Sequence, residues 1–141
     1  MARFTDDHGD LERFALDRLH AADYPSCSHP YREFRCATCG PVPVAVTLEH
    51  HSGSEWGDFK GVVHGRCTGC DATRVLFGFT GSGRRLESEE RPVCPCGSTA
   101  FFAGMGERYE GTDGIPGFFD EGVIVAKCAA CGGNAVLAWT D

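Results

Sequence analysis

Eight of the nine cysteines of this chain fall into four close pairs, and closely spaced thiols are typical metal ligands. Two cysteines on one tight turn can point at the same ion, and two such turns facing each other complete a tetrahedron of thiolates around zinc. The sequence therefore predicts two structural Zn ions as cofactors. Their predicted ligands are Cys36, Cys39, Cys67, Cys70, Cys94, Cys96, Cys128 and Cys131.

Disulfide bonds are the alternative chemistry for so many cysteines. The chain starts with Met1-Ala2-Arg3-Phe4 and soon becomes acidic, without the apolar segment of a secretory signal. No stretch approaches the roughly 20 apolar residues of a membrane span. We therefore expect a cytoplasmic protein in a reducing setting, where thiols stay available for metal.

The charge of the chain favours a protein partner over nucleic acid. Its 20 acidic and 13 basic side chains give a formal net charge of −7. Generic binding to nucleic acid needs clustered Lys and Arg that neutralise phosphates. The only basic dipeptide, Arg84-Arg85, is followed closely by glutamates.

Apolar spacing predicts a helix within the N-terminal segment 1–35. Over residues 6–22 the apolar side chains recur at intervals of three and four, and acidic residues at the start suit the helix dipole. We expect the apolar stripe to pack on a sheet. A helix that binds a partner is the alternative.

The remainder of the chain contains two copies of one unit, at 36–80 and 93–141, joined by a polar linker at 81–92. Residues 61–67 align without gaps with residues 122–128, which indicates a duplicated supersecondary unit. Each copy is predicted to form three strands, because β-branched and aromatic residues concentrate there. The predicted strands are 42–49, 60–66 and 73–80 in the first copy and 99–109, 122–127 and 135–140 in the second.

With these features the chain resembles the zinc-ribbon superfamily, in which two cysteine knuckles on β-hairpins hold one zinc. The resemblance covers residues 36–80 and 94–140. It implies a small, metal-stabilised, mainly β fold of two tandem three-stranded antiparallel zinc ribbons, here with an N-terminal α-helix. A knuckle turn needs a positive φ after its second cysteine, which glycine and, at Asp71, aspartate tolerate. The glycines in this place are Gly40, Gly97 and Gly132.

The grouping of the knuckles stays open at this point. Each copy could carry a complete site, or the pairs could interleave, with Cys36/Cys39 facing Cys94/Cys96. The internal repeat favours a complete site in each copy. The turn Cys94-Pro95-Cys96 is one residue shorter than usual, so the second site is the better candidate for a labile metal or a redox dithiol.

Few other residues suggest chemistry. Cys27 and His29 could form a nucleophile or an extra metal ligand, although an idle cysteine is the commoner case. We interpret His50-His51, at a predicted strand end, as solvated.

Elongation-factor ribbons of the superfamily carry an acidic catalytic tip with basic flanks. The nearest match, Asp120-Glu121, is expected at a strand entrance without an arginine neighbour, so that activity is not carried over.

Large apolar side chains precede the second knuckle strand of each unit, and they either cover the sheet or contact a partner. These residues are Trp56, Phe59, Ile115, Phe118 and Phe119.

The leading hypothesis is a non-enzymatic, zinc-binding adaptor or regulatory subunit that acts on a protein partner. One alternative is a rubredoxin-like iron protein for electron transfer, since four thiolates also bind iron. Another is an accessory component of a zinc enzyme.

Overall fold

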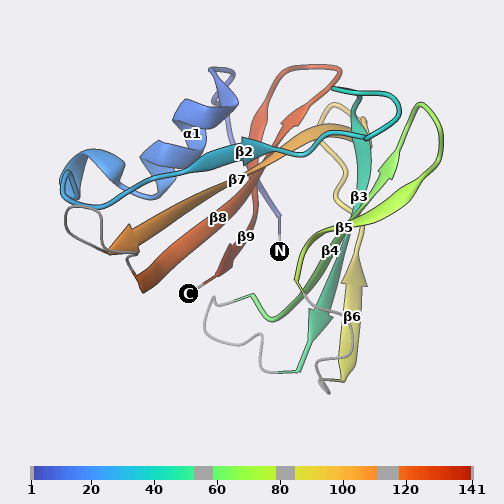
Figure 1. Ribbon diagram of the computed structural model, residues 1–141. Coiled ribbons are helices and arrows are strands. Elements are labelled where there is room, and N and C mark those ends of the chain that lie inside the picture. The colour runs from blue at the N-terminus through green and yellow to red at the C-terminus, as the bar shows by residue number, and fades with distance from the viewer. Residues whose placement is uncertain (1, 53–58, 79–84, 111–117, 141) are drawn as a thin grey trace.

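The chain folds into a mainly β structure. The computed structural model describes residues 2–52, 59–78, 85–110 and 118–140. Within these residues, nine strands join in one antiparallel sheet, and one short α-helix lies against it (Figure 1). The prediction of a mainly β protein with an N-terminal helix is confirmed.

Consecutive hairpins supply most of the sheet. Its main path is β1-β9-β8-β7-β3-β4-β5, while β2 pairs with β7 and β6 pairs with β3. The strands are β1 (Arg3–Phe4), β2 (Tyr31–Glu33), β3 (Val44–His51), β4 (Gly61–Cys67), β5 (Thr73–Phe77), β6 (Leu86–Glu90), β7 (Ala100–Glu110), β8 (Phe118–Cys128) and β9 (Asn134–Thr140).

The sequence predicts two ribbons joined by a polar linker. The structure differs from this prediction in how the two halves are connected. β3 pairs with β7, with Val44 opposite Phe101, so both sets of hairpins belong to one sheet. Residues 86–90 of the predicted linker form β6, which pairs antiparallel with β3. Most side chains of β6 are exposed, and a strand without a buried face lacks the alternation by which strands are recognised.

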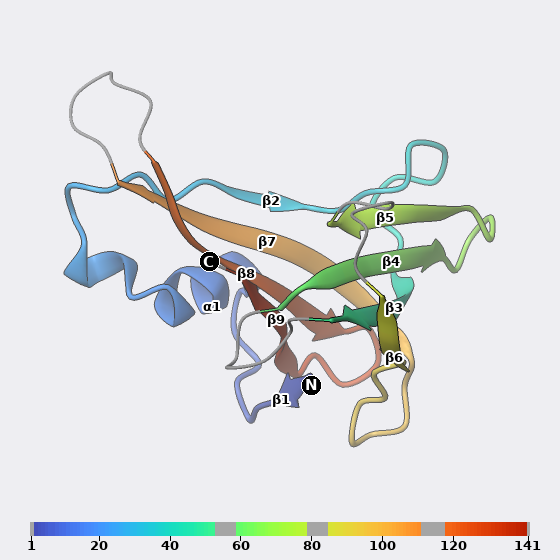
Figure 2. The ribbon, with the colours of Figure 1, turned by 90° about the horizontal axis from the view of Figure 1, so that it is seen from below.

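Strand β8 has a hydrophobic core on each of its faces. Val123 and Val125 pack under α1, whereas Ile124 and Ala126 point into a larger core formed with β3, β4 and β7. Because residues 122–126 of β8 are buried on both faces, this part of the strand is a continuous apolar run rather than an alternation. Figure 2 shows α1 beside β7 and β8, and the strands β3–β5 at the other end of the sheet.

Helix α1 spans Leu11–Arg18, which is shorter than the predicted 6–22. It begins after Asp10, whose Oδ2 accepts a hydrogen bond of 3.0 Å from the N–H of Arg13. A 3-10 turn, η1 (Ala21–Asp23), follows it. The expected packing of the apolar stripe on the sheet is confirmed, with Leu11, Phe14, Ala15 and Leu19 buried. None of the helices in the described residues is long and apolar enough to cross a membrane.

Candidate metal centres

The first cysteine tetrad lies where two turns of the chain meet. The β4–β5 hairpin supplies Cys67 and Cys70, and a turn before β3 supplies Cys36 and Cys39. The four sulfurs lie within 4.8 Å of one another, and Cys36 Sγ is 3.7 Å from Cys70 Sγ. The turn before β3 is closed by backbone hydrogen bonds of 3.1 and 2.9 Å between Cys36 and Gly40.

The second tetrad has the same arrangement in the other half of the chain. The β8–β9 hairpin supplies Cys128 and Cys131, and the turn before β7 supplies Cys94 and Cys96. Cys94 Sγ lies 3.6 Å from Cys131 Sγ, and Cys96 Sγ lies 3.5 Å from Cys128 Sγ. The knuckles are therefore grouped within each half, not interleaved. The short Cys94-Pro95-Cys96 turn still brings both of its sulfurs to one site.

The spacing of the sulfurs fits a tetrahedral metal ion. Zn–S bonds of about 2.3 Å place the sulfurs of a tetrahedron about 3.8 Å apart. Three of the sulfur pairs are 3.7, 3.6 and 3.5 Å apart, and the other pairs within each tetrad lie within 4.8 Å. All nine cysteines are free thiols. A disulfide would bring two sulfurs to about 2.05 Å. Each tetrad could therefore hold one metal ion.

Backbone conformation at the knuckles follows the expected pattern. Gly40, Gly97 and Gly132 have φ of 76°, 96° and 79°, and Asp71 has φ of 62°. Such turns direct N–H groups at the sulfurs and so stabilise thiolates. In the two hairpin knuckles these hydrogen bonds are 3.4 to 3.5 Å long and run from Gly69 to Cys67, from Cys131 to Cys128 and from Gly133 to Cys131.

The first tetrad contains one acidic thiol. The backbone N–H groups of Cys39 and Thr38 point at Cys36 and lower its pKa to about 6. By contrast, interactions with the sulfurs of Cys70 and Cys67 raise the pKa of Cys39 to about 12. In the absence of a metal, the tetrad therefore concentrates its negative charge on Cys36 at neutral pH.

The second tetrad is polarised in the same way. Burial opposes the ionisation of Cys128, but the N–H groups of Cys131 and Ala130, together with the thiols of Cys96 and Cys94, lower its pKa to about 6. The N–H of Cys96 favours ionisation of Cys94, yet burial and the neighbouring thiols raise the pKa of Cys94 to about 12. In each tetrad the thiolate, which is the form that binds metal, is therefore favoured at one cysteine, Cys36 or Cys128.

The N-terminal residues contact the β8–β9 hairpin that carries Cys128 and Cys131 of the second tetrad. The sequence analysis did not predict this contact. Asn134 is fully buried, and its Nδ2 donates to Asp7 Oδ1 over 2.7 Å and to the carbonyl of Gly9 over 3.0 Å. The ring of His8 lies beside the knuckle, with Nδ1 3.2 Å from the carbonyl oxygen of Cys131. Residues 5–9 were predicted partly as helix, and their polar composition carried no signal for this contact.

The histidines at the end of β3 are not solvated as predicted. His51 is only 8% exposed, and its Nε2 lies 3.4 Å from Glu49 Oε1. His50 Nε2 lies 3.1 Å from Glu90 Oε1 on β6, and His64 Nε2 lies 3.1 Å from Glu49 Oε2. The prediction that these histidines are solvated was wrong because it did not include strand β6, which pairs with this end of β3.

Cys27 and His29 lie apart from both tetrads. Cys27 is half-buried, and within the described part of the chain neither residue belongs to a group that could hold a metal ion. The Nε2 atom of His29 is buried and has no hydrogen-bond partner among the described residues. The structure thus gives no support to an extra ligand at either position.

The predicted contact residues have different environments. Phe59 is buried in the larger core, with its ring 6.5 Å from that of Phe77, so it covers the sheet. Phe119 is 38% exposed and packs edge-on against Tyr109. The other predicted contacts lie outside the described residues or side chains, namely Trp56, Ile115 and the side chain of Phe118.

Asp120 and Glu121 do have an arginine neighbour, which corrects the sequence analysis. Arg108 Nε lies 2.8 Å from Asp120 Oδ2, and its Nη2 lies 2.9 Å from Glu121 Oε2. Its Nη1 donates to the carbonyl of Leu19 over 2.6 Å, and the ring of Tyr24 covers the guanidinium at 4.1 Å. The β7–β8 register places Arg108 opposite Glu121, so only a correct strand pairing could have revealed it.

Comparisons of this chain with protein-family models, with curated proteins and with solved structures found no match. The resemblance to zinc ribbons therefore depends on the cysteines, their turns and the geometry of the two tetrads.

Proposed function

We propose that this protein is a non-enzymatic adaptor or regulatory subunit that binds two structural zinc ions and acts on a protein partner. The observation that supports it is the pair of complete sulfur tetrads. Four protein thiolates close the coordination sphere of zinc, whereas a catalytic zinc keeps one position for water or substrate. Soft thiolate ligands also select zinc over magnesium, calcium and manganese.

The placement of the tetrads supports a structural role for the metal. In each half, a hairpin end is brought against a turn that lies more than 25 residues earlier in the chain. An ion at each place would fasten the segments that enter β3 and β7 to the neighbouring hairpins. Metal binding of this kind contributes directly to the free energy of folding.

The adaptor role is supported by exposed apolar side chains on an acidic protein. Phe119, one of the predicted contact residues, is 38% exposed. Such side chains typically anchor protein interfaces. We propose that Phe119 contacts the partner together with Trp56 and Ile115, which belong to the same predicted set.

Elemental analysis of protein purified without added chelator tests the metal assignment. We expect two zinc ions per chain and, after Co²⁺ substitution, the intense visible bands of tetrahedral cobalt thiolates. Iron with the red colour of a four-thiolate site would instead favour the electron-transfer alternative. A water or substrate ligand on either ion would favour an enzyme.

Affinity purification from the native host tests the adaptor role. The triple variant Trp56→Ala, Ile115→Ala, Phe119→Ala should lose the co-purifying partner, and Phe102→Ala is the matched control because it removes an equally exposed ring. Retention of every partner by the triple variant would contradict the proposed contact surface.

A further inference from the structure

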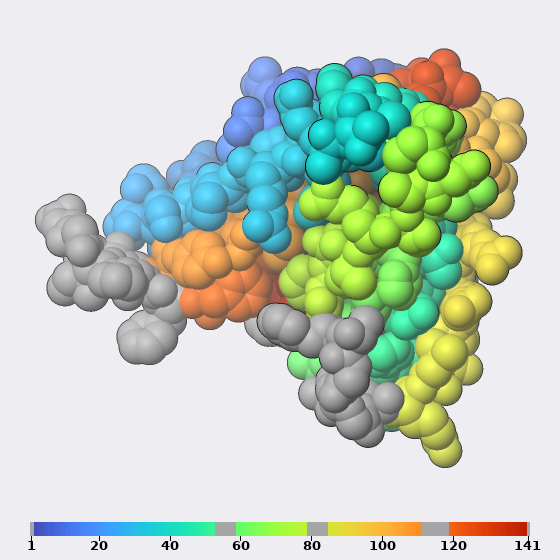
Figure 3. All heavy atoms as spheres, turned by 45° about the vertical axis from the view of Figure 1, so that its right-hand side comes forward, coloured from blue at the N-terminus to red at the C-terminus, as the bar shows by residue number. Residues whose placement is uncertain are grey.

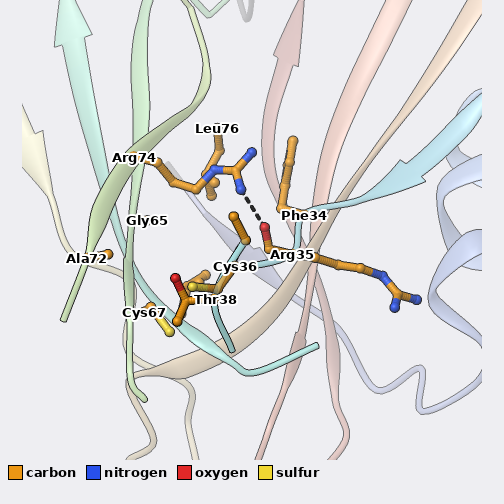
Figure 4. A pocket seen from close by; sticks show the side chains of 11 residues that line it. Phe34, Arg35, Cys36, Thr38, Gly65, Cys67, Ala72, Arg74 and Leu76 are labelled. Atoms are coloured by element: carbon orange, nitrogen blue, oxygen red, sulfur yellow. Dashed lines mark hydrogen bonds between the residues drawn. The ribbon is translucent and has the colours of Figure 1, made fainter. Parts of the chain in front are cut away.

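A pocket of about 280 Å³ lies beside the first tetrad, between the β4–β5 hairpin and residues 34–38 (Figure 4). In the space-filling view, the cyan residues near position 40 and the light-green hairpin adjoin on one face of the molecule (Figure 3). The volume is close to the lower end of the range for small-ligand pockets, so it suits one compact group.

The walls of the pocket are mainly apolar. Phe34 stands on one side, Leu76 and Ala72 stand on the other, and Val44 lies in the lining as well. Gly65 contributes no side chain, and a Cβ atom there would lie 2.9 Å from a methyl carbon of Leu76. A side chain at this position of β4 would therefore displace Leu76, which forms part of the pocket wall.

Arg74 is the charged side chain that reaches across the pocket, whose lining also includes Thr38 and the tetrad cysteines Cys36 and Cys67. Arg74 donates a hydrogen bond to the carbonyl oxygen of Arg35 and extends across the pocket towards Phe34, whereas the side chain of Arg35 points away. A guanidinium has five N–H donors, and that one hydrogen bond occupies only part of them. Among the described lining residues there is no carboxylate to neutralise Arg74.

The strand that carries Arg74 has an open edge. Within the described residues β5 pairs only with β4 and ends the path of the sheet. An extended peptide could therefore form backbone hydrogen bonds with β5 beside the pocket.

We propose that this pocket binds apolar carboxylates, with one apolar group between Phe34 and Leu76 and the carboxylate on Arg74. The C-terminal residue of a polypeptide and a free carboxylic acid share this chemistry. Metal-loaded four-thiolate zinc would carry a formal charge of −2 nearby, so binding of an anion depends on Arg74. The site is independent of the proposed adaptor surface.

Chemical-shift titration of the zinc-loaded protein tests the proposal with three probes: N-acetylphenylalanine, its primary amide and 3-phenylpropionate. We expect saturable shifts of the amides of Gly65, Ala72 and Leu76 with both acids, and at least tenfold weaker binding of the amide. Tighter binding of N-acetylphenylalanine than of 3-phenylpropionate identifies a polypeptide C-terminus as the source. The reverse order identifies a free acid.

Two variants and a control complete the test. Arg74→Met keeps the apolar stem and should reduce the preference for acid over amide to less than twofold, while Ala72→Leu should weaken every probe by filling the pocket. Arg66→Met is the control, since Arg66 contacts Asp71 and does not line this pocket. Absence of saturable shifts at the pocket, or unchanged acid binding by Arg74→Met, would overturn the proposal.

Discussion

At the scale of the residue, one acidic thiol in each tetrad favours metal binding, namely Cys36 in the first and Cys128 in the second. Backbone N–H groups lower the pKa of Cys36 to about 6, whereas the pKa of Cys39 is about 12. At pH 7.5 Cys36 is therefore a thiolate, whereas Cys39 must lose its proton when a divalent ion binds. Below pH 6 Cys36 is protonated as well, so its proton must also leave.

Metal affinity should consequently rise steeply with pH at both tetrads. We expect a net release of protons when zinc binds at pH 7.5, measured by calorimetry in buffers of different ionisation enthalpy. Competition with a chelator should show weaker binding at pH 6.5 than at pH 8.5 after correction for the chelator's own protons. A release close to zero would contradict the thiolate assignment.

Asn134 is the residue that holds the N-terminal segment against the second tetrad. The N–H of Gly9 and the amide of Asn134 hold the pKa of Asp7 below its usual value. Asn134→Ala removes the two hydrogen bonds that the Asn134 amide donates to Asp7 Oδ1 and to the carbonyl of Gly9. At about 0.5–1.5 kcal/mol for each hydrogen bond, the free energy of unfolding should fall by about 1–3 kcal/mol. Denaturant unfolding of the zinc-loaded protein measures the change. Ser98→Ala, a partly exposed knuckle residue, is the control, and equal stability of the two variants would refute the role of Asn134.

At the scale of the element, Arg108 connects the end of α1 to the β7–β8 hairpin. Its side chain is buried and contacts two carboxylates and the carbonyl of Leu19. Arg108→Met keeps the volume but leaves these acceptors unpaired, so we expect a loss of about 2–4 kcal/mol in unfolding free energy.

Hydrogen exchange should locate the effect of Arg108→Met at α1 and the adjoining end of β8. The exposed Arg13→Met on the same helix is the matched control and should change stability by less than about 0.5 kcal/mol. Equal effects of the two substitutions would show that the network contributes nothing.

The elements that the sequence predicted are those with a strong local signal. Cysteine spacing and the glycines after it predicted the knuckles, and apolar runs predicted β7, β8 and β9 within a few residues. β1, β2 and β6 were missed because they are short and mostly exposed, so no face of them is apolar enough to create a period. The contact of Arg108 with Glu121 required a strand register, which composition does not contain.

At the scale of the whole molecule, the pairing of β3 with β7 joins the two predicted units into one sheet. Val44 of β3 and Phe101 of β7 lie opposite each other and share the larger core. Loss of metal from the first tetrad should therefore weaken the second half as well. In the double variant Cys36→Ser, Cys39→Ser, we expect faster hydrogen exchange in β7 as well as in β3 and β4. Unchanged exchange in β7 would indicate two independent units.

The count of bound metal per tetrad tests the central proposal most directly. Native mass spectrometry of the wild-type chain and of Cys27→Ser, whose cysteine lies outside both tetrads, should show two zinc ions. The double variant Cys36→Ser, Cys39→Ser should show one. A wild-type protein without metal, or a double variant that keeps two ions, would contradict the account.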